Sequence, residues 1–412
     1  MPLKIAILSK ADLTGGGASR MAEQLCGQLN AAGYIAHHYL AFKRSEYISA
    51  RKLYGNPASE WRIIRLHRWV KRCGFPELIP WELFPLWRQG VLQYDLLHFH
   101  DLSSSISPLT VRYLARRVPT VWTFHDCSPF TGGCLFPEDC TKFHTHCSRC
   151  PQLGEWPLDT KRDFATLLQR IKRKTAQEGR FTPIVPSSWM VSQAMKSKFF
   201  AKPPSIVPNG IDMEVFKPFD KVAMRAKLGL PLDRFIVLLS AANLSSPRKG
   251  VRFAVEALKG VAERKPYVLL LGNGVKGIQG ILFGLDYCDC SFVADDQKRA
   301  EYFAAADVLL CPSLAESFCL VVLEAMAVAT PAISFATGGI TDLILHEQTG
   351  YLVEPRNVEG LVTGLQLALT DGCATEWGRN ARKRAVDMFS KELFLAHHLR
   401  VYEQVISEFK GP

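Results

Sequence analysis

The sequence predicts an α/β protein of two domains, each a doubly wound parallel sheet covered by helices. Three observations lead to this prediction. Short apolar, β-branched segments alternate with amphipathic helical segments along almost the whole chain, as in parallel sheets. The proline-rich stretch 201–218 separates the strand candidates into two series, as a connection between domains does. The length of 412 residues corresponds to two or three domains, at roughly 100–200 residues each.

The two series of strand candidates define the two domains. The first series comprises 5–8, 35–42, 96–100, 120–124 and 184–185, and the second comprises 235–240, 268–271, 308–311 and 332–334. We therefore place the first domain at 1–212 and the second at 213–389. Apolar residues spaced by about one turn predict a final helix over 391–409.

Composition and charge restrict the class of protein and of partner. Hydrophobic residues make up 48% and charged residues 22% of the chain, which excludes wholesale disorder, collagen and coiled coil. Fifty Lys and Arg against 39 Asp and Glu give a net charge of +11. This balance predicts an anionic partner, which could be nucleic acid, an anionic membrane surface or a phosphate-bearing substrate.

The chain carries no predicted targeting or membrane-spanning segment. The apolar run 5–8 is shorter than the core of a signal peptide, which needs roughly 7–15 residues. No uninterrupted apolar stretch reaches the roughly 18 residues of a spanning helix. We therefore expect a cytoplasmic protein with reduced thiols, and any membrane contact to be peripheral.

A glycine-rich loop follows the first predicted strand and opens a helix. Its residues 14–19 read TGGGAS, and glycines at a helix N-terminus let an anionic ligand approach the backbone. The G-x-G-x-x-G spacing of a dinucleotide site is absent, and the second strand ends without an acid for a ribose, so we do not expect NAD. A tight turn without a ligand is the alternative.

Two carboxylates lie at and after the end of the strand 308–311. Glu316 is in the following loop, where open α/β sheets bind ligands. Glu324 lies within an apolar helix, where a carboxylate is costly unless it is paired or bound to a ligand. A solvated position on a polar face is the alternative for Glu324. The amides of 317–320, at the start of the same helix, suit a phosphate.

A pair of cations follows the first strand of the second domain. Arg248 and Lys249 come after the strand 235–240 and open a helix, a position that suits a diphosphate. A solvated surface pair is the alternative.

Four cysteines cluster in the first domain, in the pattern C-x(5)-C-x(6)-C-x(2)-C. They are Cys134, Cys140, Cys147 and Cys150. Four thiolates suit tetrahedral zinc, and C-x(2)-C is a usual half-site, so we expect a structural zinc. His144 or His146 could replace one ligand. Buried free thiols and disulfides are the alternatives.

The segment 43–88 combines basic and aromatic residues, with ten Lys or Arg against four Glu. A predicted helix over 60–73 has an apolar face, and an opposite face with arginines and tryptophans. The second face comprises Trp61, Arg62, Arg65, Arg68, Trp69 and Arg72. Such a face suits an anionic membrane interface. A solvated basic face and a nucleic-acid patch are the alternatives, although no RRM, KH or helix-turn-helix signature is present.

Taken together, these motifs resemble the retaining family 4 glycosyltransferases, which have the GT-B fold of two Rossmann-like domains facing a cleft. The matching pieces occur in the family's order across most of the chain. They are Gly15-Gly16-Gly17, Thr123-Phe124-His125-Asp126, 207–212, Lys249-Gly250, Ala306-Asp307 before Pro312-Ser313, Glu316 with Glu324 as an E-x(7)-E pair, Pro331 and Gly338-Gly339. The final helix, 390–412, resembles the family's helix that packs back on the first domain. The cysteine-rich stretch 131–151 resembles an insert of colanic-acid and exopolysaccharide-type transferases.

The resemblance implies roles for individual residues. Glu324 would bind the ribose hydroxyls of a nucleotide-sugar donor, and Glu316 would bind hydroxyls of the donor sugar. Lys249 would neutralise the leaving diphosphate. Amides at the start of the helix would assist in donor binding; they belong to Phe318, Cys319 and Leu320. In the first domain, His125 would touch the transferred sugar. Gly16 and Gly17 would let the glycine-rich loop approach the diphosphate and the acceptor closely.

The sequence departs from the family pattern at three places, one of which is the usual glycine before Pro331, displaced here by Ala329-Thr330. Asn243 stands where the family has an arginine, and Arg248 would supply that charge from another position in the donor site. The family's Glu-Gly-Phe-Gly is Glu316-Ser317-Phe318-Cys319 here, which reduces the backbone freedom of the sugar pocket.

The resemblance implies transfer of a sugar with retention from a nucleotide sugar to a lipid-linked glycan acceptor. It implies exopolysaccharide, capsule or lipopolysaccharide biosynthesis at the inner face of the cell membrane. We expect no cofactor for catalysis and no nucleic-acid partner. A catalytically silent GT-B scaffold and a zinc-loop nucleic-acid-binding protein are the alternatives.

Overall fold

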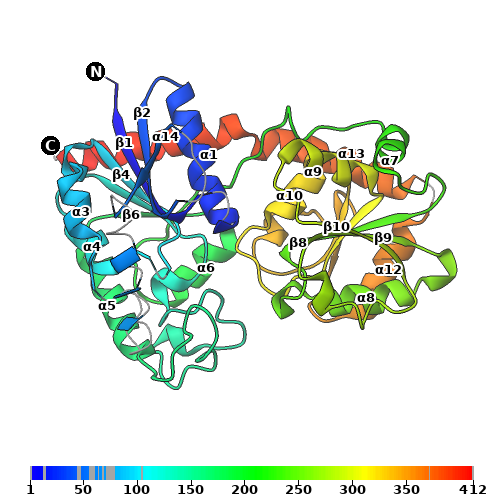
Figure 1. The fold of residues 1–412 in the computed structure, drawn as a ribbon, viewed down its shortest axis with the longest axis horizontal. Helices are drawn as coiled ribbons and strands as arrows, with labels where there is room; N and C mark the ends of the chain where they lie inside the picture. Colours follow the sequence, from blue (N-terminus) through cyan, green and yellow to red (C-terminus); the bar gives the residue numbers. More distant parts are fainter. Residues whose placement is uncertain are drawn as a thin grey trace. The chain divides into compact units, whose positions relative to one another are not determined.

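The computed structural model describes residues 2–12, 15–43, 48–54, 61–63, 65–66, 69–70, 79–103, 105–370 and 372–410. The chain divides into two compact units (Figure 1). The first unit is Met1–Val207 with Leu395–Pro412, and the second is Pro208–Phe394. Each unit contains one parallel β-sheet with its own hydrophobic core.

The first unit is built on a seven-stranded sheet in the order β3-β2-β1-β4-β5-β6-β7, with every pair parallel. The strands are β1 (Lys4–Ala11), β2 (Ile35–Phe42), β3 (Ala50–Lys52), β4 (Leu96–Phe99), β5 (Thr120–Thr123), β6 (Thr182–Val185) and β7 (Ser205–Ile206). Strand β1 is central, and its apolar residues 5–8 are fully buried because a parallel sheet is covered on both faces. The chain turns from one side of β1 to the other at β4, which makes the sheet doubly wound.

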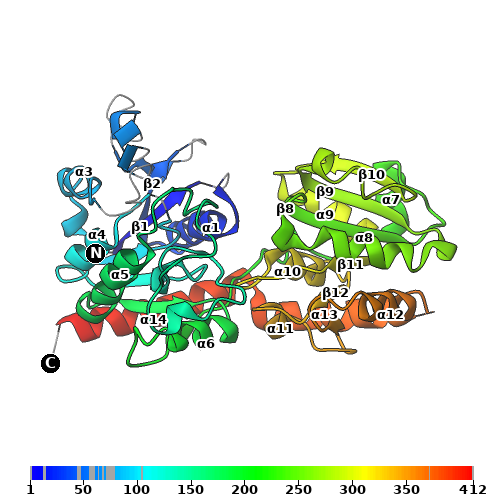
Figure 2. The ribbon, with the colours of Figure 1, turned by 90° about the horizontal axis from the view of Figure 1, so that it is seen from below.

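Helices and short loops cover this sheet. The helices are α1 (Gly17–Ala31), α3 (Leu83–Arg88), α4 (Pro108–Leu114), α5 (Ala165–Glu178), α6 (Ser188–Lys196) and the end of α14 (Lys391–Lys410), with 3-10 turns η2 (Val91–Gln93), η3 (Ser128–Phe130) and η4 (Lys142–His144). Helices α4 and α5 lie side by side (Figure 2), where Arg112 and Arg116 form ion pairs with Glu178. Within the described residues, no helix is both long and apolar enough to span a bilayer.

The second unit is built on a six-stranded sheet in the order β10-β9-β8-β11-β12-β13, again with every pair parallel. The strands are β8 (Ile236–Asn243), β9 (Tyr267–Asn273), β10 (Asp286–Ser291), β11 (Val308–Cys311), β12 (Ala332–Phe335) and β13 (Gly350–Val353). The helices are α7 (Lys221–Leu228), α8 (Val251–Lys259), α9 (Asp296–Ala305), α10 (Leu320–Ala327), α11 (Ile340–Leu343), α12 (Val358–Ala368), α13 (Cys373–Phe389) and the start of α14, with 3-10 turns η5 (Pro247–Lys249), η6 (Ala262–Arg264) and η7 (Val275–Gly277).

Two core layers cover the faces of the second sheet. Successive residues of β8 alternate between them: Ile236 and Leu238 belong to one core cluster, and Val237 and Leu239 belong to the other. Figure 1 shows α8 and α12 on one face and α9, α10 and α13 on the other. This two-sided burial explains why β8 and β11 are apolar throughout most of their length.

The predicted strands are all present, and the final helix extends over Lys391–Lys410. The sequence missed β3, β7, β10 and β13, which are short or lie at sheet edges. The two residues of β7 are exposed and β10 is largely polar, so neither forms the apolar run that marks a buried strand. The predicted boundaries at 212 and 390 compare with unit boundaries at Val207 and Leu395.

Candidate functional site

A buried carboxylate lies between two cations at the carboxyl edge of the second sheet. Glu316 is 8% exposed and lies in the loop after β11. Its Oε1 accepts a hydrogen bond from Lys249 Nζ at 2.5 Å and lies 3.5 Å from Arg248 Nη1. Because β8 and β11 are neighbours in the sheet, the loops that follow them meet at this edge. The structure therefore brings three of the predicted donor-site residues into contact.

Glu316 and Lys249 keep each other ionised. Burial raises the pKa of Glu316, but the charges of Lys249 and Arg248, together with hydrogen bonds from Lys249 and Ser313, outweigh burial and hold that pKa below its usual value. Burial lowers the pKa of Lys249, but the charge of Glu316 and smaller contributions from Cys319 and Cys311 together outweigh burial and the opposing charge of Arg248, so this pKa lies above its usual value. The cluster has two positive charges and one negative charge. The surplus positive charge favours an anion at this edge of the sheet.

Backbone contacts hold the two loops together. Arg248 donates from Nη1 to the Ala315 carbonyl, and the Leu314 amide donates to the Arg248 carbonyl at 2.8 Å. Gly250 has a φ of 66°, and a Cβ there would lie 1.9 Å from the Pro312 carbonyl oxygen. Only glycine permits this close approach, so the Lys249-Gly250 pair of the sequence motif places the cation and its loop together.

A second glycine supports the loop of Glu316 itself. Gly338 has a φ of 58°, and a Cβ there would lie 1.8 Å from the Glu316 carbonyl oxygen. The same carbonyl accepts a hydrogen bond from the Gly339 amide at 3.0 Å. The Gly338-Gly339 motif therefore fixes the backbone that carries the carboxylate.

The start of α10 lies next to Glu316 in the sequence. Cys319 precedes the helix with a φ of 80°, in the region that favours glycine, and no side chain caps the helix. A non-glycine residue in this conformation costs roughly 1–2 kcal/mol. Cys319 therefore adopts a conformation that favours glycine, at a position where the family resemblance places a glycine. The Phe318 ring is buried against Phe389, with 5.8 Å between ring centroids, which leaves its backbone as the part available to a ligand.

Glu324 is buried on α10 and forms an ion pair with Arg299 of α9. The guanidinium of Arg299 also lies 5.6 Å from the centroid of the Phe216 ring. This pairing offsets the cost of a carboxylate in an apolar helix, as the sequence required. Sequence reasoning did not find Arg299, since nothing in helix α9 marks one arginine as facing the core.

Asn243 lies at the exposed end of β8. Its Oδ1 accepts hydrogen bonds from the Ser245 amide at 3.1 Å and from the Ser245 hydroxyl at 2.8 Å. The Asn243 side chain thus stabilises the loop that follows β8. The positive charge near this loop is that of Arg248, which belongs to the turn η5.

The remaining predicted site residues belong to the first unit, at the carboxyl edge of its sheet. Gly16 caps α1 with a φ of 103°, and Gly17 is the first residue of that helix. His125 follows β5, and its Nε2 lies 2.9 Å from Nδ1 of His100, which follows β4. Burial and, to a smaller extent, the charge of His398 lower the pKa of His125 to about 3, so the ring is neutral at pH 7.

The sequence analysis missed a network of hydrogen-bonded histidines beside His125. His98 Nδ1 lies 2.7 Å from the Tyr402 hydroxyl of α14, and His98 Nε2 lies 2.7 Å from the Thr123 hydroxyl. The rings of His98 and His100 have centroids 4.2 Å apart. Their spacing of two residues on a strand places both rings on one face, and this period was the available sequence signal.

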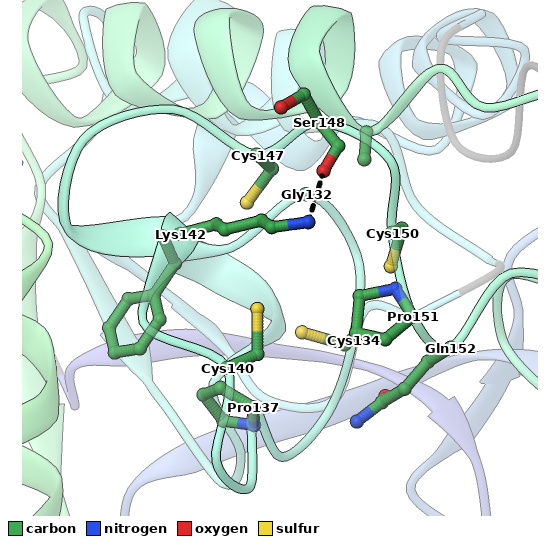
Figure 3. A pocket seen from close by; sticks show the side chains of 12 residues that line it. Gly132, Cys134, Pro137, Cys140, Lys142, Cys147, Ser148, Cys150, Pro151 and Gln152 are labelled. Atoms are coloured by element: carbon green, nitrogen blue, oxygen red, sulfur yellow. Dashed lines mark hydrogen bonds between the residues drawn. The ribbon is translucent and has the colours of Figure 1, made fainter.

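The four clustered cysteines line one cavity of about 20 Å³ in the first unit. Figure 3 shows the sulfurs of Cys134, Cys140, Cys147 and Cys150 directed toward a common interior. Burial raises the pKa of Cys134 to about 12 and of Cys147 to about 11, and the other cysteines of the cluster add to both shifts.

The two predicted substitute ligands do not belong to this cavity. His144 and His146 line a separate cavity with Gln169 and Arg173. Among the residues that the structure describes, no group of three or more His, Cys, Asp or Glu side chains is arranged to hold a metal ion as it stands.

The basic-aromatic segment lies partly outside the described residues, which exclude 44–47, 55–60, 64, 67–68 and 71–78 and thus Arg68 and Arg72. In the described part, Trp61 and Trp69 are 61% and 63% exposed. Helix α3 adds Phe84 and Trp87, 63% and 61% exposed. Arginine accompanies the aromatic rings, since the Arg65 guanidinium lies 5.3 Å from a Trp61 ring centroid and that of Arg88 lies 5.9 Å from the Phe84 ring centroid.

Comparison with known proteins identifies the class. A family model described as "Glycosyltransferase Family 4" matches residues 15–215, and one described as "Glycosyl transferases group 1" matches residues 236–371. A D-inositol 3-phosphate glycosyltransferase of Arthrobacter sp. (strain FB24) is 32% identical over 72% of this chain and 68% of its own length. The chain belongs to the family 4 (group 1) glycosyltransferases.

Other relatives are matched over about half of their length. A D-inositol 3-phosphate glycosyltransferase of Acidothermus cellulolyticus is 27% identical over 55% of this chain and 54% of its own length. An N-acetyl-alpha-D-glucosaminyl L-malate synthase of Bacillus anthracis is 30% identical over 50% of this chain and 55% of its own length. These relatives act on different acceptors, so membership of the family does not specify a substrate.

Solved structures confirm the predicted GT-B fold. Sucrose-phosphate synthase from Thermosynechococcus elongatus has a TM-score of 0.74 and 22% identity over 98% of this chain and 99% of its own. The HepE protein of Anabaena, solved in complex with UDP-glucose, has a TM-score of 0.70 and 18% identity over 98% of this chain and 100% of its own. At these identities the likeness concerns the fold.

We expect Gly338→Ala to destabilise the second unit by at least about 2–3 kcal/mol, because the new Cβ adds overpacking to an unfavourable φ. Gly229→Ala is the matched control, since Gly229 has a φ of 67° but nothing within 4 Å of the position of its Cβ. The control should lose only the conformational cost of about 1–2 kcal/mol. Urea unfolding of both variants measures the difference, and equal losses would contradict the role given to the Glu316 carbonyl.

Proposed function

We propose that this protein is a retaining glycosyltransferase that uses a nucleotide-sugar donor. The observation that carries the proposal is the buried carboxylate of Glu316 between Lys249 and Arg248, at the sheet edge where α/β proteins bind ligands. A nucleotide sugar presents both chemistries that this cluster suits, an anionic diphosphate and a hydroxyl-bearing ring. The structural neighbour HepE was solved with UDP-glucose and with UDP, which supports a donor of this class.

Residues of the second unit would bind the nucleotide and the diphosphate of the donor and contact its sugar. Lys249 and Arg248 bind the diphosphate, Glu316 accepts hydrogen bonds from sugar hydroxyls, and Glu324 accepts them from the ribose. The amides of Phe318, Cys319 and Leu320 at the start of α10 add donors for the phosphate oxygens, because this helix start has no side-chain cap. Asn243 contributes a polar end of β8 beside them.

Charge stabilisation would supply most of the rate enhancement. Breaking the bond between the sugar and the phosphate places negative charge on the departing diphosphate and positive charge on the sugar. Lys249 and Arg248, already oriented by Glu316, stabilise the diphosphate without reorganisation. Both carboxylates of the site are ion-paired in the structure, which suits them to binding more than to nucleophilic attack. We therefore assign retention to attack on the face from which the diphosphate leaves, with the phosphate accepting the acceptor's proton.

His125 would contact the transferred sugar from the first unit. It is neutral at pH 7 and its ring is oriented by the hydrogen bond with His100. A neutral imidazole can donate to or accept from a sugar hydroxyl without adding charge next to the developing positive sugar. Gly16 and Gly17 provide backbone, free of side chains, at the start of α1.

The acceptor side is assigned to a lipid-linked glycan at an anionic membrane surface, in exopolysaccharide, capsule or lipopolysaccharide biosynthesis. Exposed aromatic rings accompanied by arginines support this assignment, on helix α3 and around Trp61 and Trp69. Such pairs suit the interface of a bilayer with anionic headgroups. The protein would then act as a peripheral membrane enzyme at the cytoplasmic face.

A catalytically silent GT-B protein is the second candidate. Asn243 and Ser317 favour it, because they stand where the family resemblance places an arginine and a glycine. Transfer or hydrolysis of a nucleotide sugar by the purified protein separates the two candidates. A thermal-shift screen against nucleotide sugars selects the donor for that assay, since a bound donor raises the melting temperature by mass action.

We expect Lys249→Ala to lower kcat/KM for the selected donor at least about 100-fold, or about 2.7 kcal/mol, through loss of charge stabilisation at the diphosphate. Lys259→Ala is the matched control, because Lys259 is exposed in the last turn of α8. Steady-state kinetics with both variants, checked for equal folding, make the comparison. Turnover close to the wild type in Lys249→Ala would reject the diphosphate assignment.

We expect the double variant Trp87→Ser with Arg88→Glu to reduce sedimentation with phosphatidylglycerol vesicles at least about tenfold, because each cation near an anionic surface contributes about 1 kcal/mol. Trp156→Ser is the control, since Trp156 is also exposed, at 51%, but lies outside α3. Equal sedimentation of the double variant and the wild type would reject the membrane surface proposed for α3.

A further inference from the structure

We propose that Cys134, Cys140, Cys147 and Cys150 bind a structural zinc ion in the first unit. None of the four side chains has a role in the proposed sugar transfer. They come from one segment of the chain, and their thiols converge on a single cavity (Figure 3). The proposal does not depend on the donor site, which lies in the other unit.

The cavity has the size and chemistry of a site for one small soft cation. Its volume of about 20 Å³ exceeds the roughly 10–15 Å³ that one water molecule needs. Apolar side chains also line the cavity beside the sulfurs; they belong to Pro137, Phe143, Pro151 and Ala165. Four thiolates are the donor set that zinc takes in closed structural sites, where no position remains for water.

Backbone amides already surround two of the sulfurs. The Gly132 amide donates a hydrogen bond to the Cys147 sulfur, and the Gln152 amide donates one to the Cys150 sulfur. Amide donors of this kind orient metal-bound thiolates and stabilise their negative charge. Only Pro151 lies between Cys150 and Gln152, so the chain supplies this amide donor two positions after the second ligand of the C-x(2)-C half-site.

The segment that carries the cysteines has little regular secondary structure of its own. Between η3 and α5, over residues 131–164, all of which the structure describes, the only regular element is the single turn η4. Its own apolar cluster is small: Cys134 packs with Leu158 and with Leu168 of α5. A long loop without secondary structure pays a large entropy for its order, and a metal with four ligands would offset that cost.

Polar contacts hold the segment against α5 and keep the cysteines near the cavity. The Cys147 amide donates to Gln169 Oε1 at 2.6 Å, and the Cys150 amide donates to Asp163 Oδ2 at 2.8 Å. Lys142 donates from Nζ to the carbonyls of Ser148 and Arg149, at 3.0 Å each, and its side chain lines the same cavity. Four thiolates and one Zn²⁺ sum to a charge of −2, and the ammonium of Lys142 is a nearby counter-charge.

Because no group of three or more His, Cys, Asp or Glu side chains among the described residues is arranged to hold a metal ion, zinc binding requires the four cysteine side chains to close on the cavity. Binding removes the four thiol protons and forms four zinc–sulfur bonds, without any change of oxidation state. Two disulfides are the competing arrangement, and the structure has all four cysteines as free thiols.

Metal analysis of the full-length protein, purified without chelator, tests the proposal. We expect about one zinc per chain in the wild type and less than about 0.2 in Cys134→Ser and in Cys150→Ser, because each change removes one of four ligands. Cys373→Ser is the matched control and should keep its zinc, since Cys373 is half-buried on α13 in the second unit. Zinc below about 0.2 per chain in the wild type after reloading with ZnSO₄, or equal zinc in the variants and the control, would overturn the site.

Measurements on the wild type keep the test decisive if a variant fails to fold. Titration of the metal-free protein with Co²⁺ should give the intense visible absorption of a tetrahedral cobalt thiolate, at one cobalt per chain. Alkylation without reductant, followed by mass spectrometry, should find the four thiols protected by zinc and reactive after chelation. Disulfide-linked peptides, or thiols that react equally before and after chelation, would overturn the proposal.

Discussion

The ion pair between Glu316 and Lys249 is the interaction on which the candidate site depends. It joins the loops after β8 and β11, which lie far apart in the sequence and next to each other in the sheet. Two glycines serve the same junction, because Gly250 allows one loop to approach the Pro312 carbonyl and Gly338 allows another segment to approach the Glu316 carbonyl. A buried ion pair is weak evidence for stability, since desolvation offsets much of its attraction. Its value here is positional: it holds two cations at the edge of a sheet before any ligand arrives.

The second acid of the site follows the same principle. Glu324 is buried and forms an ion pair with Arg299, so both carboxylates of the site, Glu316 and Glu324, have a cationic partner. A donor that enters such a site exchanges one set of hydrogen bonds and charge contacts for another, and the charges need little reorganisation when the diphosphate leaves. Preorganised charge of this kind is usually the largest contribution to catalysis of group transfer. In the first unit, the hydrogen bond between His100 and His125 orients a neutral His125, so this unit would contribute position without charge.

The sequence predicted those parts of the fold and site that follow from local pattern. Central strands such as β8 and β11 were found because burial on both faces requires apolar runs, and Glu316 and Lys249 were found because they follow such strands. The sequence did not predict the edge strand β10, because this strand is largely polar and pairs on one side only. The sequence also did not predict the ion pair of Arg299 with Glu324, because this pair arises from the packing of α9 on α10, which no local pattern encodes. The glycine-like backbone of Cys319 is likewise set by the loop around it and not by its own preference.

The most direct test of this account is the affinity of Glu316→Gln for the nucleoside diphosphate of the selected donor, compared with its affinity for the intact nucleotide sugar. Isothermal titration of both ligands into the wild type and the variant gives the four constants. If Glu316 holds Lys249 and Arg248 in position for the diphosphate and itself binds the sugar, the variant should bind the diphosphate more weakly than the wild type. The loss of affinity for the nucleotide sugar should exceed the loss for the diphosphate and reach at least about tenfold, or about 1.4 kcal/mol. Unchanged affinity for the diphosphate, or equal losses for the two ligands, would contradict the account.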